Sequence, residues 1–155
     1  MHCLDLVGGS PQWSLDRGDL AFIACADRGV AVVVGNRQLT AIELNTGKVA
    51  AGWPLKLPDN SLPSGRGYFD GGHYHLPLNV AGAGELAAIQ LDPPAIVHRS
   101  QWLRGAIPGN LICHRGRIVS QNVDWLESFH QSQPPGQDAG QTIDFGRFTE
   151  QRATD

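Results

Sequence analysis

Two histidines one residue apart, His73 and His75, form the pattern in this chain that comes closest to a metal site. In a β-strand, residues two positions apart project from the same face, so both imidazoles would approach one ion. A protein zinc site needs three or four ligands, and only Asp70 lies nearby in the sequence. We therefore name His73 and His75 as candidate ligands, but the sequence favours a strand with incidental histidines and predicts no complete metal site.

The segment Ser64-Gly65-Arg66-Gly67 places an arginine between two glycines. Glycines expose backbone amides and arginine offers a planar fork of donors, so the segment is suited to hold an anion. A tight turn that leads into the next structural unit, with Arg66 bonded to a carbonyl, explains the same residues. The connections at 54–67 and 99–109 are the longest, and we expect them to form a binding surface. The candidate binding-loop residues are Arg66, Tyr68, Trp102 and Arg104.

No other residue has the surroundings of a catalytic group. The cysteines are three, an odd number, and lack the Cys-x-x-Cys spacing of zinc or redox motifs. Small buried side chains in strands explain them, although one pair is free to form a disulfide. No serine lies in the Gly-x-Ser-x-Gly context of a hydrolase nucleophile. The sequence therefore predicts no catalytic residue. The cysteines are Cys3, Cys25 and Cys113.

Composition favours a single domain built from short strands. The chain has 155 residues, of which 41% are hydrophobic and 17% charged, enough for one ordinary core. Its 19 glycines and 10 prolines exceed average use and favour turns over long helices. A net charge of −3 without clustered Lys or Arg gives no electrostatic reason to expect nucleic acid as a partner. No apolar stretch is long enough to span a bilayer, and no export signal is visible.

Short apolar segments rich in β-branched residues recur along the chain and are separated by turn residues. Helical periodicity is nearly absent, so these segments predict antiparallel hairpins in an all-β protein. From residue 131 the chain becomes polar and contains a Pro-Pro-Gly breaker, so we expect residues 131–155 to be disordered. The expected strands are 21–26, 29–35, 38–44, 74–80, 85–91, 110–115 and 117–123.

Four strand ends share an alternating apolar pattern, which indicates an internal repeat. Their last apolar residues are 38, 47 and 38 positions apart, and this matches the length of one four-stranded propeller blade. We call the four segments the repeat markers: CLDL at 3–6, AIEL at 41–44, AAIQL at 87–91 and WLESF at 125–129. With their flanking residues the markers cover 3–13, 41–53, 87–98 and 123–129.

The first two markers contain residue types suited to a structural joint. In each, an acidic residue lies four positions before a glycine, and a tryptophan follows. Glycine supplies the positive φ of a tight turn, and the acidic side chain accepts hydrogen bonds from turn amides. The tryptophan is expected to pack flat between neighbouring blades, where its large area stabilises the contact. These structural repeat residues are Asp5, Gly9, Trp13, Glu43, Gly47 and Trp53.

The marker pattern, Ala-x-Asp-x-x-x-Gly-x-x-x-Trp with allowance at each place, resembles the tryptophan-docking repeat of quinoprotein-type β-propellers, the pyrroloquinoline quinone (PQQ) enzyme-like repeats. The segment PSGRGYFDGGHYHLPL at 63–78, followed by GELAAIQL, is similar to bacterial proteins with PQQ-like repeats. The resemblance covers residues 1–130 and weakens in the third copy, where Gln90, Pro94 and His98 replace the acid, the glycine and the tryptophan. It implies a partial β-propeller of about three four-stranded antiparallel blades.

The resemblance implies a non-catalytic scaffold that binds a protein or peptide through propeller loops. One alternative is a part of a quinoprotein oxidoreductase, which needs PQQ, a stacking tryptophan and usually a calcium site. No such ligand set stands out, so we expect no cofactor in this chain, and PQQ with calcium only in a complete parent protein. A further alternative is a carbohydrate-binding propeller that uses Trp53, Tyr68 and Tyr74 as sugar platforms.

The first marker begins at Cys3, so the chain starts at the end of a blade, and about three blades do not close a ring. The simpler expectation is a piece of a longer propeller, and the other is association with a second copy. The expected partners are therefore the remaining blades or another copy, besides a peptide ligand. The resemblance implies an exported or periplasmic parent protein, whereas the sequence itself predicts no location.

Overall fold

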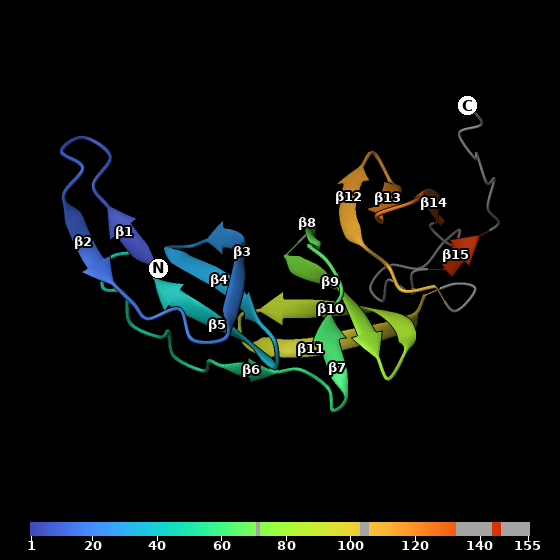
Figure 1. The fold of residues 1–155 in the computed structure, drawn as a ribbon, viewed down its shortest axis with the longest axis horizontal. Coiled ribbons are helices and arrows are strands. Elements are labelled where there is room, and N and C mark those ends of the chain that lie inside the picture. The colour runs from blue at the N-terminus through green and yellow to red at the C-terminus, as the bar shows by residue number, and fades with distance from the viewer. Residues whose placement is uncertain (71, 103–105, 133–143, 147–155) are drawn as a thin grey trace.

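The computed structural model describes residues 1–70, 72–102, 106–132 and 144–146. Within these residues it contains β-strands and no helix, which confirms the predicted all-β class. The strands form four antiparallel sheets, and Figure 1 shows them following one another in chain order along the long axis of the molecule. The described part of the chain accordingly holds no helix with the length and apolar character needed to cross a membrane.

The four sheets are numbered in chain order. The first sheet pairs β1 (His2–Leu4) with β2 (Pro11–Ser14). The second contains β3 (Leu20–Asp27), β4 (Val30–Gly35), β5 (Gln38–Glu43) and β6 (Leu55–Lys56). The third contains β7 (Ser61–Pro63), β8 (Tyr68–Asp70), β9 (His73–Val80), β10 (Ala83–Leu91) and β11 (Pro94–Gln101). The fourth contains β12 (Asn110–His114), β13 (Arg117–Gln121), β14 (Leu126–Ser132) and β15 (Asp144–Gly146).

Hairpin turns set the order of strands within each sheet. Arg28 and Gly29 join β3 to β4 with φ of 42° and 80°, and Arg115 and Gly116 join β12 to β13 with 49° and 73°. Two successive residues at positive φ match the twist of antiparallel strands, so these loops favour tight hairpins. The sequence predicted turns at both places. Each of the seven predicted strand segments lies on an observed strand: β3, β4, β5, β9, β10, β12 and β13.

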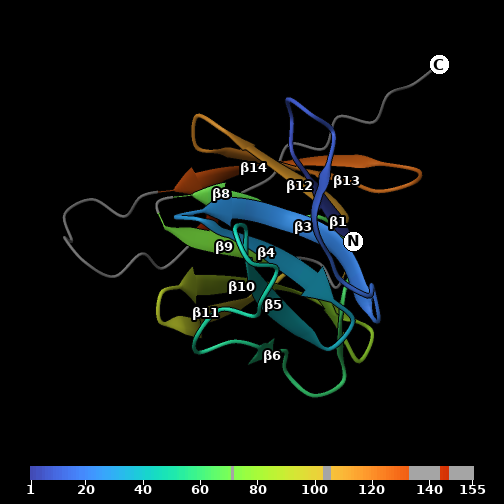
Figure 2. The same cartoon turned by 90° about the vertical axis from the view of Figure 1, so that its left-hand side faces the viewer.

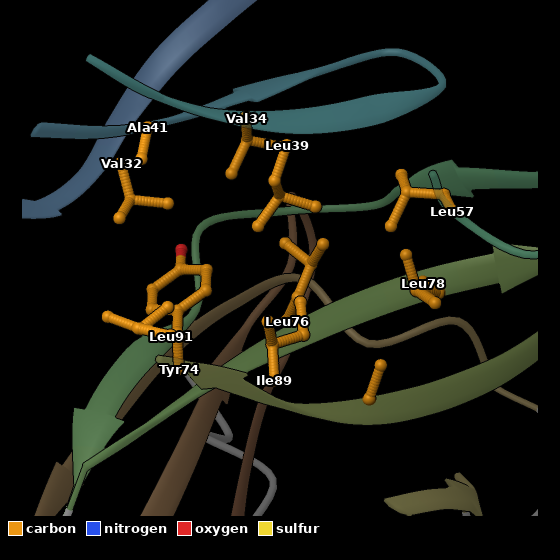
Figure 3. Packing of buried hydrophobic residues seen from close by; sticks show 11 residues of the cluster. Val32, Val34, Leu39, Ala41, Leu57, Tyr74, Leu76, Leu78, Ile89 and Leu91 are labelled. Carbon is orange, nitrogen blue, oxygen red and sulfur yellow. The ribbon is translucent and has the colours of Figure 1, made fainter. Parts of the chain in front are cut away.

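The larger hydrophobic core lies between the second and third sheets, at what we call the second junction. Figure 3 shows Val32 and Val34 of β4 facing Tyr74 and Leu76 of β9 across this junction. The intervening residues of β4 are also buried, on the other face of the sheet. A strand buried on both faces forms a continuous apolar run, which is why residues 30–34 carry no polar side chain.

A second core lies between the third and fourth sheets, at the third junction, and uses the opposite face of the third sheet. Trp102, which follows β11, is only 4% exposed, and its ring meets the ring of Phe129 edge-on with centroids 4.5 Å apart. The third sheet is therefore packed between its two neighbours. The buried members of this core are Tyr68, Leu86, Trp102, Leu111, Ile118 and Phe129.

The second and third sheets keep the same strand order in space. Figure 2, which looks along the stack, shows β3 as the upper and β6 as the lower edge of the second sheet, with β8 above and β11 below in the third. In every sheet the repeat marker falls on the next-to-last strand: β1, β5, β10 and β14. Sheets of equal order that carry the marker at the same place indicate repeated units. Ring closure is not seen among the described residues, so the propeller architecture stays a prediction.

Three predicted segments differ from the structure or extend beyond its described part. The expected long connection at 54–67 contains β6 and β7, and the start of 99–109 belongs to β11. Of the tail expected to be disordered, residues 131–132 lie in β14 and 144–146 form β15, which pairs with β14. The rest of 131–155 lies outside the described residues.

Candidate functional site

The candidate binding loop at 64–67 interrupts the first strand of the third sheet. β7 ends at Pro63 and β8 begins at Tyr68, and both pair with β9, where their partners are Leu78 and His75. Four loop residues therefore stand opposite two residues of β9, as in an enlarged β-bulge. The surplus backbone must leave the plane of the sheet at this point.

Hydrogen bonds within the third sheet hold both ends of the loop. The amide of Ser64 donates to the carbonyl of Pro77 at 3.0 Å, and the amide of Gly67 donates to the phenol oxygen of Tyr74 at 2.9 Å. Tyr74 is 1% exposed and belongs to the core of the second junction. A Cβ at Gly67 would collide with the carbonyl oxygen of His75, so this approach requires glycine.

The fourth sheet holds the middle of the loop. The amide of Arg66 donates to Oδ1 of Asn110 at 2.9 Å, and the amide of Leu111 donates to the carbonyl of Arg66 at 2.7 Å. A Cβ at Gly65 would collide with the backbone of Gly109, so the two chain segments meet here without a side chain between them. The loop therefore fastens the first strand of the third sheet to that of the fourth.

The side chain of Arg66 reaches toward the second sheet. Its Cζ lies 5.2 Å from the ring centroid of Phe22 in β3, a cation–π arrangement. The amides of Ser64, Arg66 and Gly67 already have acceptors within the protein. These three amides therefore form no free cradle for an anion, whereas Arg66 is an exposed residue. The sequence allows two arrangements, an amide cradle for an anion or a bond from Arg66 to a carbonyl. The structure shows a different one, in which Arg66 lies over the ring of Phe22.

Directly beyond the loop, the rings of Tyr68 and His75 stack with centroids 4.6 Å apart and planes 12° from parallel. Burial lowers the pKa of His75 to about 4; the carboxylate of Asp70 acts in the opposite direction, and His73 and His98 lower it further. Burial also raises the pKa of Tyr68. This imidazole and this phenol are both uncharged near neutral pH, which suits a buried stacked pair.

The two histidines named as candidate ligands have different cross-strand partners. His73 pairs with Asp70 and His75 pairs with Tyr68. Among the described residues, no group of three His, Cys, Asp or Glu side chains has the geometry to hold a metal ion.

Burial favours the neutral forms of three further side chains, those of Cys25, Cys113 and Tyr74. Burial raises the pKa of Cys25 and of Cys113, and nearby carboxylates raise both further. Burial raises the pKa of Tyr74 to about 12, although the hydrogen bond from Gly67 acts in the opposite direction. All three cysteines, Cys3 included, are free thiols. A thiol reacts as its thiolate, so the raised pKa values of Cys25 and Cys113 suit them to packing rather than to nucleophilic attack.

The sequence matches no protein-family model and no curated protein. The resemblance to PQQ-like repeats therefore stays a prediction. Fold alone does not define an activity, so a function for this chain has to be inferred from contacts between named residues.

Two of the structural repeat residues, Trp13 and Gly47, meet between the first and second sheets, at the first junction. Nε1 of Trp13 donates a hydrogen bond of 2.7 Å to the carbonyl of Leu44. A Cβ at Gly47 would lie 2.7 Å from Cδ2 of the Trp13 ring, and two further ring atoms lie within 3.0 Å of that point. The indole therefore lies against the bare backbone of the Gly47 turn.

The acidic marker residues each close their own turn. Oδ2 of Asp5 accepts a hydrogen bond of 2.6 Å from the amide of Gly8, and Oε2 of Glu43 accepts one of 2.7 Å from the hydroxyl of Thr46. Trp53, the remaining aromatic of the set, is partly buried and packs against the core of the second junction. The acidic residues thus stabilise turns, and the tryptophans lie at junctions.

Two candidate binding-loop residues, Tyr68 and Trp102, have buried side chains instead of exposed ones. The amide of Trp102 donates to the carbonyl of Gly84 at 2.8 Å, which keeps the residue beside β10 and its ring inside the third junction. Nε1 of Trp102 lies 3.4 Å from Oε2 of Glu127. Burial of Tyr68 and of Tyr74 also keeps their rings in the cores rather than at a surface where a sugar would stack. Arg104 lies outside the described residues.

Sequence reasoning did not find Phe22, Tyr74 or Asn110 as partners of the loop. Phe22 and Asn110 lie in β3 and β12, far from Arg66 in the sequence, and no short motif links Arg66 to Tyr74 in β9. The signal that was present is the pair of glycines around Arg66, because glycine is used where another backbone approaches closely.

Proposed function

We propose that this chain is a non-catalytic scaffold of the β-propeller type, whose loop at 64–67 presents Arg66 to an acidic peptide or protein segment. The observation that carries the proposal is the position of that loop. It is hydrogen-bonded to the third and fourth sheets, and Arg66 rests on Phe22 of the second. A cation fixed where three sheets meet is a rigid recognition point, and rigidity lowers the entropic cost of binding.

The repeated construction of the sheets supports the scaffold part of the proposal. The second and fourth sheets, with four strands, and the third, with five, each carry the marker on the next-to-last strand. Trp13 lies at the first junction, and Trp102 lies at the third. In β-propellers, four-stranded sheets are arranged radially and bind partners through loops and the central channel. The stacked sheets of this chain have the order and the aromatic contacts that such an arrangement needs.

The strands around the loop support an extended peptide as the partner. β3, β8 and β12 each pair with a strand on one side only among the described residues, and on the outer side of β12 the amide of Leu111 is already bonded to the loop. Each carries one exposed large apolar side chain: Ile23, Phe69 and Ile112 are 53%, 44% and 62% exposed. Open edges and apolar side chains suit an extended segment, and Arg66 adds a preference for a carboxylate.

The proposal is tested by selecting binders from a random peptide library displayed against the immobilised chain. Selected peptides are then synthesised, and their affinities are measured by fluorescence anisotropy for the wild type, Arg66→Ala and Arg37→Ala. Arg37 is an exposed arginine beyond the end of β4 and serves as the matched control. We expect the selected peptides to be acidic and Arg66→Ala to weaken them about tenfold, while Arg37→Ala leaves them unchanged.

Two results would contradict the proposal. One is that no peptide shows saturable binding, although circular dichroism shows that the protein used for the selection is folded. The other is equal affinity of the selected peptides for Arg66→Ala and the wild type. Salt dependence gives a further check, because binding through one exposed guanidinium must weaken as ionic strength rises.

A further inference from the structure

Two turns of this chain have the same construction. In the first, the amide of Gly9 donates to the carbonyl of Asp5 at 2.8 Å; in the second, the amide of Gly47 donates to the carbonyl of Glu43 at 2.9 Å. The glycine φ values are 66° and 72°. The acidic residue of each turn also accepts a hydrogen bond through its side chain. Turns with the same backbone conformation present the same surface.

The indole of Trp13 packs on the second turn, 43–47, whereas no indole packs on the first turn, 5–9. Trp13 donates to the carbonyl of Leu44 and lies against the backbone of Gly47. At the first turn, no atom lies within 4 Å of the place where a Cβ of Gly9 would stand. Leu6, which takes the position of Leu44, is 100% exposed. The turn 5–9 therefore has the backbone surface on which an indole docks at 43–47, and no side chain of the described residues covers it. We call this surface the indole seat.

The chain itself offers one tryptophan that would fill this seat. Trp13 is docked, Trp102 is 4% exposed, and Trp53 packs against the second junction. Trp125, between β13 and β14, is 38% exposed. Its neighbours Val123 and Leu126 are exposed at 98% and 66%, which makes the tip of this hairpin apolar. Exposed apolar groups gathered at one point are typical of an interaction site.

The seat and the exposed tryptophan lie at opposite ends of the molecule. Figure 1 shows β1 and β2 at one end of the long axis, and β13 and β14 at the other. One copy therefore cannot dock its own Trp125 on its own turn 5–9. Contact between two copies joins unlike surfaces, which is a heterologous interface and leads to rings or chains.

We propose that Trp125 of one copy docks on the turn 5–9 of a second copy, with its indole N–H donating to the carbonyl of Leu6. The inference rests on the proposed scaffold function and gives that scaffold a partner, namely another copy of this chain. The contact between copies would repeat the internal one between Trp13 and the turn 43–47, which has both an N–H donor and a bare glycine backbone.

The test measures weight-average mass against protein concentration by sedimentation velocity and light scattering. Gly9→Ala places a methyl group on the seat, and Gly18→Ala is its matched control. Both glycines have positive φ, 66° and 51°, with nothing within 4 Å of an added Cβ, so both carry the same backbone strain. Trp125→Phe removes the N–H donor while keeping a ring, and Trp125→Ser removes the ring as well.

We expect the wild type and Gly18→Ala to associate as concentration rises. Gly9→Ala and Trp125→Ser are expected to weaken association by about tenfold or more, and Trp125→Phe by less. A wild type that stays monomeric at millimolar concentration would overturn the inference, as would association unchanged in Gly9→Ala. Either result leaves the peptide binding of Arg66 untouched, because that site lies on the third sheet, so failure of this inference is distinguishable from failure of the proposed function.

Discussion

The indole Nε1 of Trp13 lies 2.7 Å from the carbonyl oxygen of Leu44, although the two residues are 31 positions apart in the chain. This contact and the packing of the ring on Gly47 attach the first sheet to the second. A two-stranded sheet is at best marginally stable in water by itself. The hairpin formed by β1 and β2 therefore depends on its contacts with the second sheet, chiefly the docked Trp13, with Sγ of Cys3 also 3.9 Å from the carbonyl oxygen of Leu44.

Replacing Trp13 is expected to release that hairpin without unfolding the rest of the chain. Trp13→Phe loses a hydrogen bond worth about 1 kcal/mol, and Trp13→Ala loses the ring packing as well. Amide hydrogen exchange should show progressively faster exchange in β1 and β2, with β9 and β10 unchanged. Arg37→Ala, at an exposed residue beyond the end of β4, is the control. Equal protection of β1 in Trp13→Ala and the wild type would refute the docking role.

A matched pair of glycines separates backbone strain from steric conflict. Gly29→Ala and Gly47→Ala both place alanine at positive φ, 80° and 72°, at a cost of about 1 kcal/mol each. Only at Gly47 would the added Cβ collide with Trp13, so Gly47→Ala should also detach the first sheet. Hydrogen exchange of β1 measures the difference. In a Trp13→Ala background the difference should disappear, and its persistence would mean that the collision is not the cause.

Burial of His75 predicts a loss of stability in acid. Its pKa is lowered from 6.5 to about 4, so the unfolded chain binds the proton more tightly than the folded one. The contribution of this group is fully present above pH 6.5 and is lost as the pH falls toward 4, by about 3 kcal/mol at most. His75→Phe keeps a ring against Tyr68 and removes the titration. Urea unfolding across this range should show a shallower acid limb for His75→Phe, whereas His114→Gln, at an exposed residue, should follow the wild type.

The two tyrosines should respond differently to removal of the hydroxyl. Tyr74→Phe leaves the amide of Gly67 without its acceptor, at a cost of about 1–3 kcal/mol. The hydroxyl of Tyr68 is buried and has no hydrogen-bond partner among the described residues, so Tyr68→Phe should be neutral or stabilising. Thermal unfolding of both variants checks this contrast. Equal destabilisation by the two substitutions would contradict the anchoring of the loop by Tyr74.

Alkaline titration gives a separate measurement on the same side chains. Burial raises the pKa of both Tyr68 and Tyr74 above the usual value of 10, to about 12 for Tyr74. The folded chain therefore favours the neutral phenols, and their contribution to stability is lost as the pH rises above 10. Ultraviolet absorbance should show no tyrosinate at pH 10 in the folded protein. Because the chain has only 2 tyrosines, ionisation at pH 10 without unfolding would show that neither is buried as described.

The sequence predicted the local part of this fold well, because local structure follows from residues close together. Runs such as 30–34 have the β-branched composition of a strand buried on both faces, and the structure places that run in the centre of the second sheet. The dipeptides Arg28-Gly29 and Arg115-Gly116 adopt the positive φ angles of tight hairpins. The repeat markers fall on the next-to-last strand of each sheet, because their alternating apolar pattern is that of a strand with one face in a core.

Only the tertiary structure decided which side chains meet across the junctions. Arg66 meets Asn110 and Phe22, each more than 40 positions away, because stacked sheets bring the first strands of neighbouring units together. Trp102 turned inward because its backbone pairs with Gly84, and no nearby residue signals that bond. Composition and spacing determine strands, turns and the length of a unit. Contacts between units depend on strand register and on sheet packing, which are set by the sum of many weak contacts and not by any one residue.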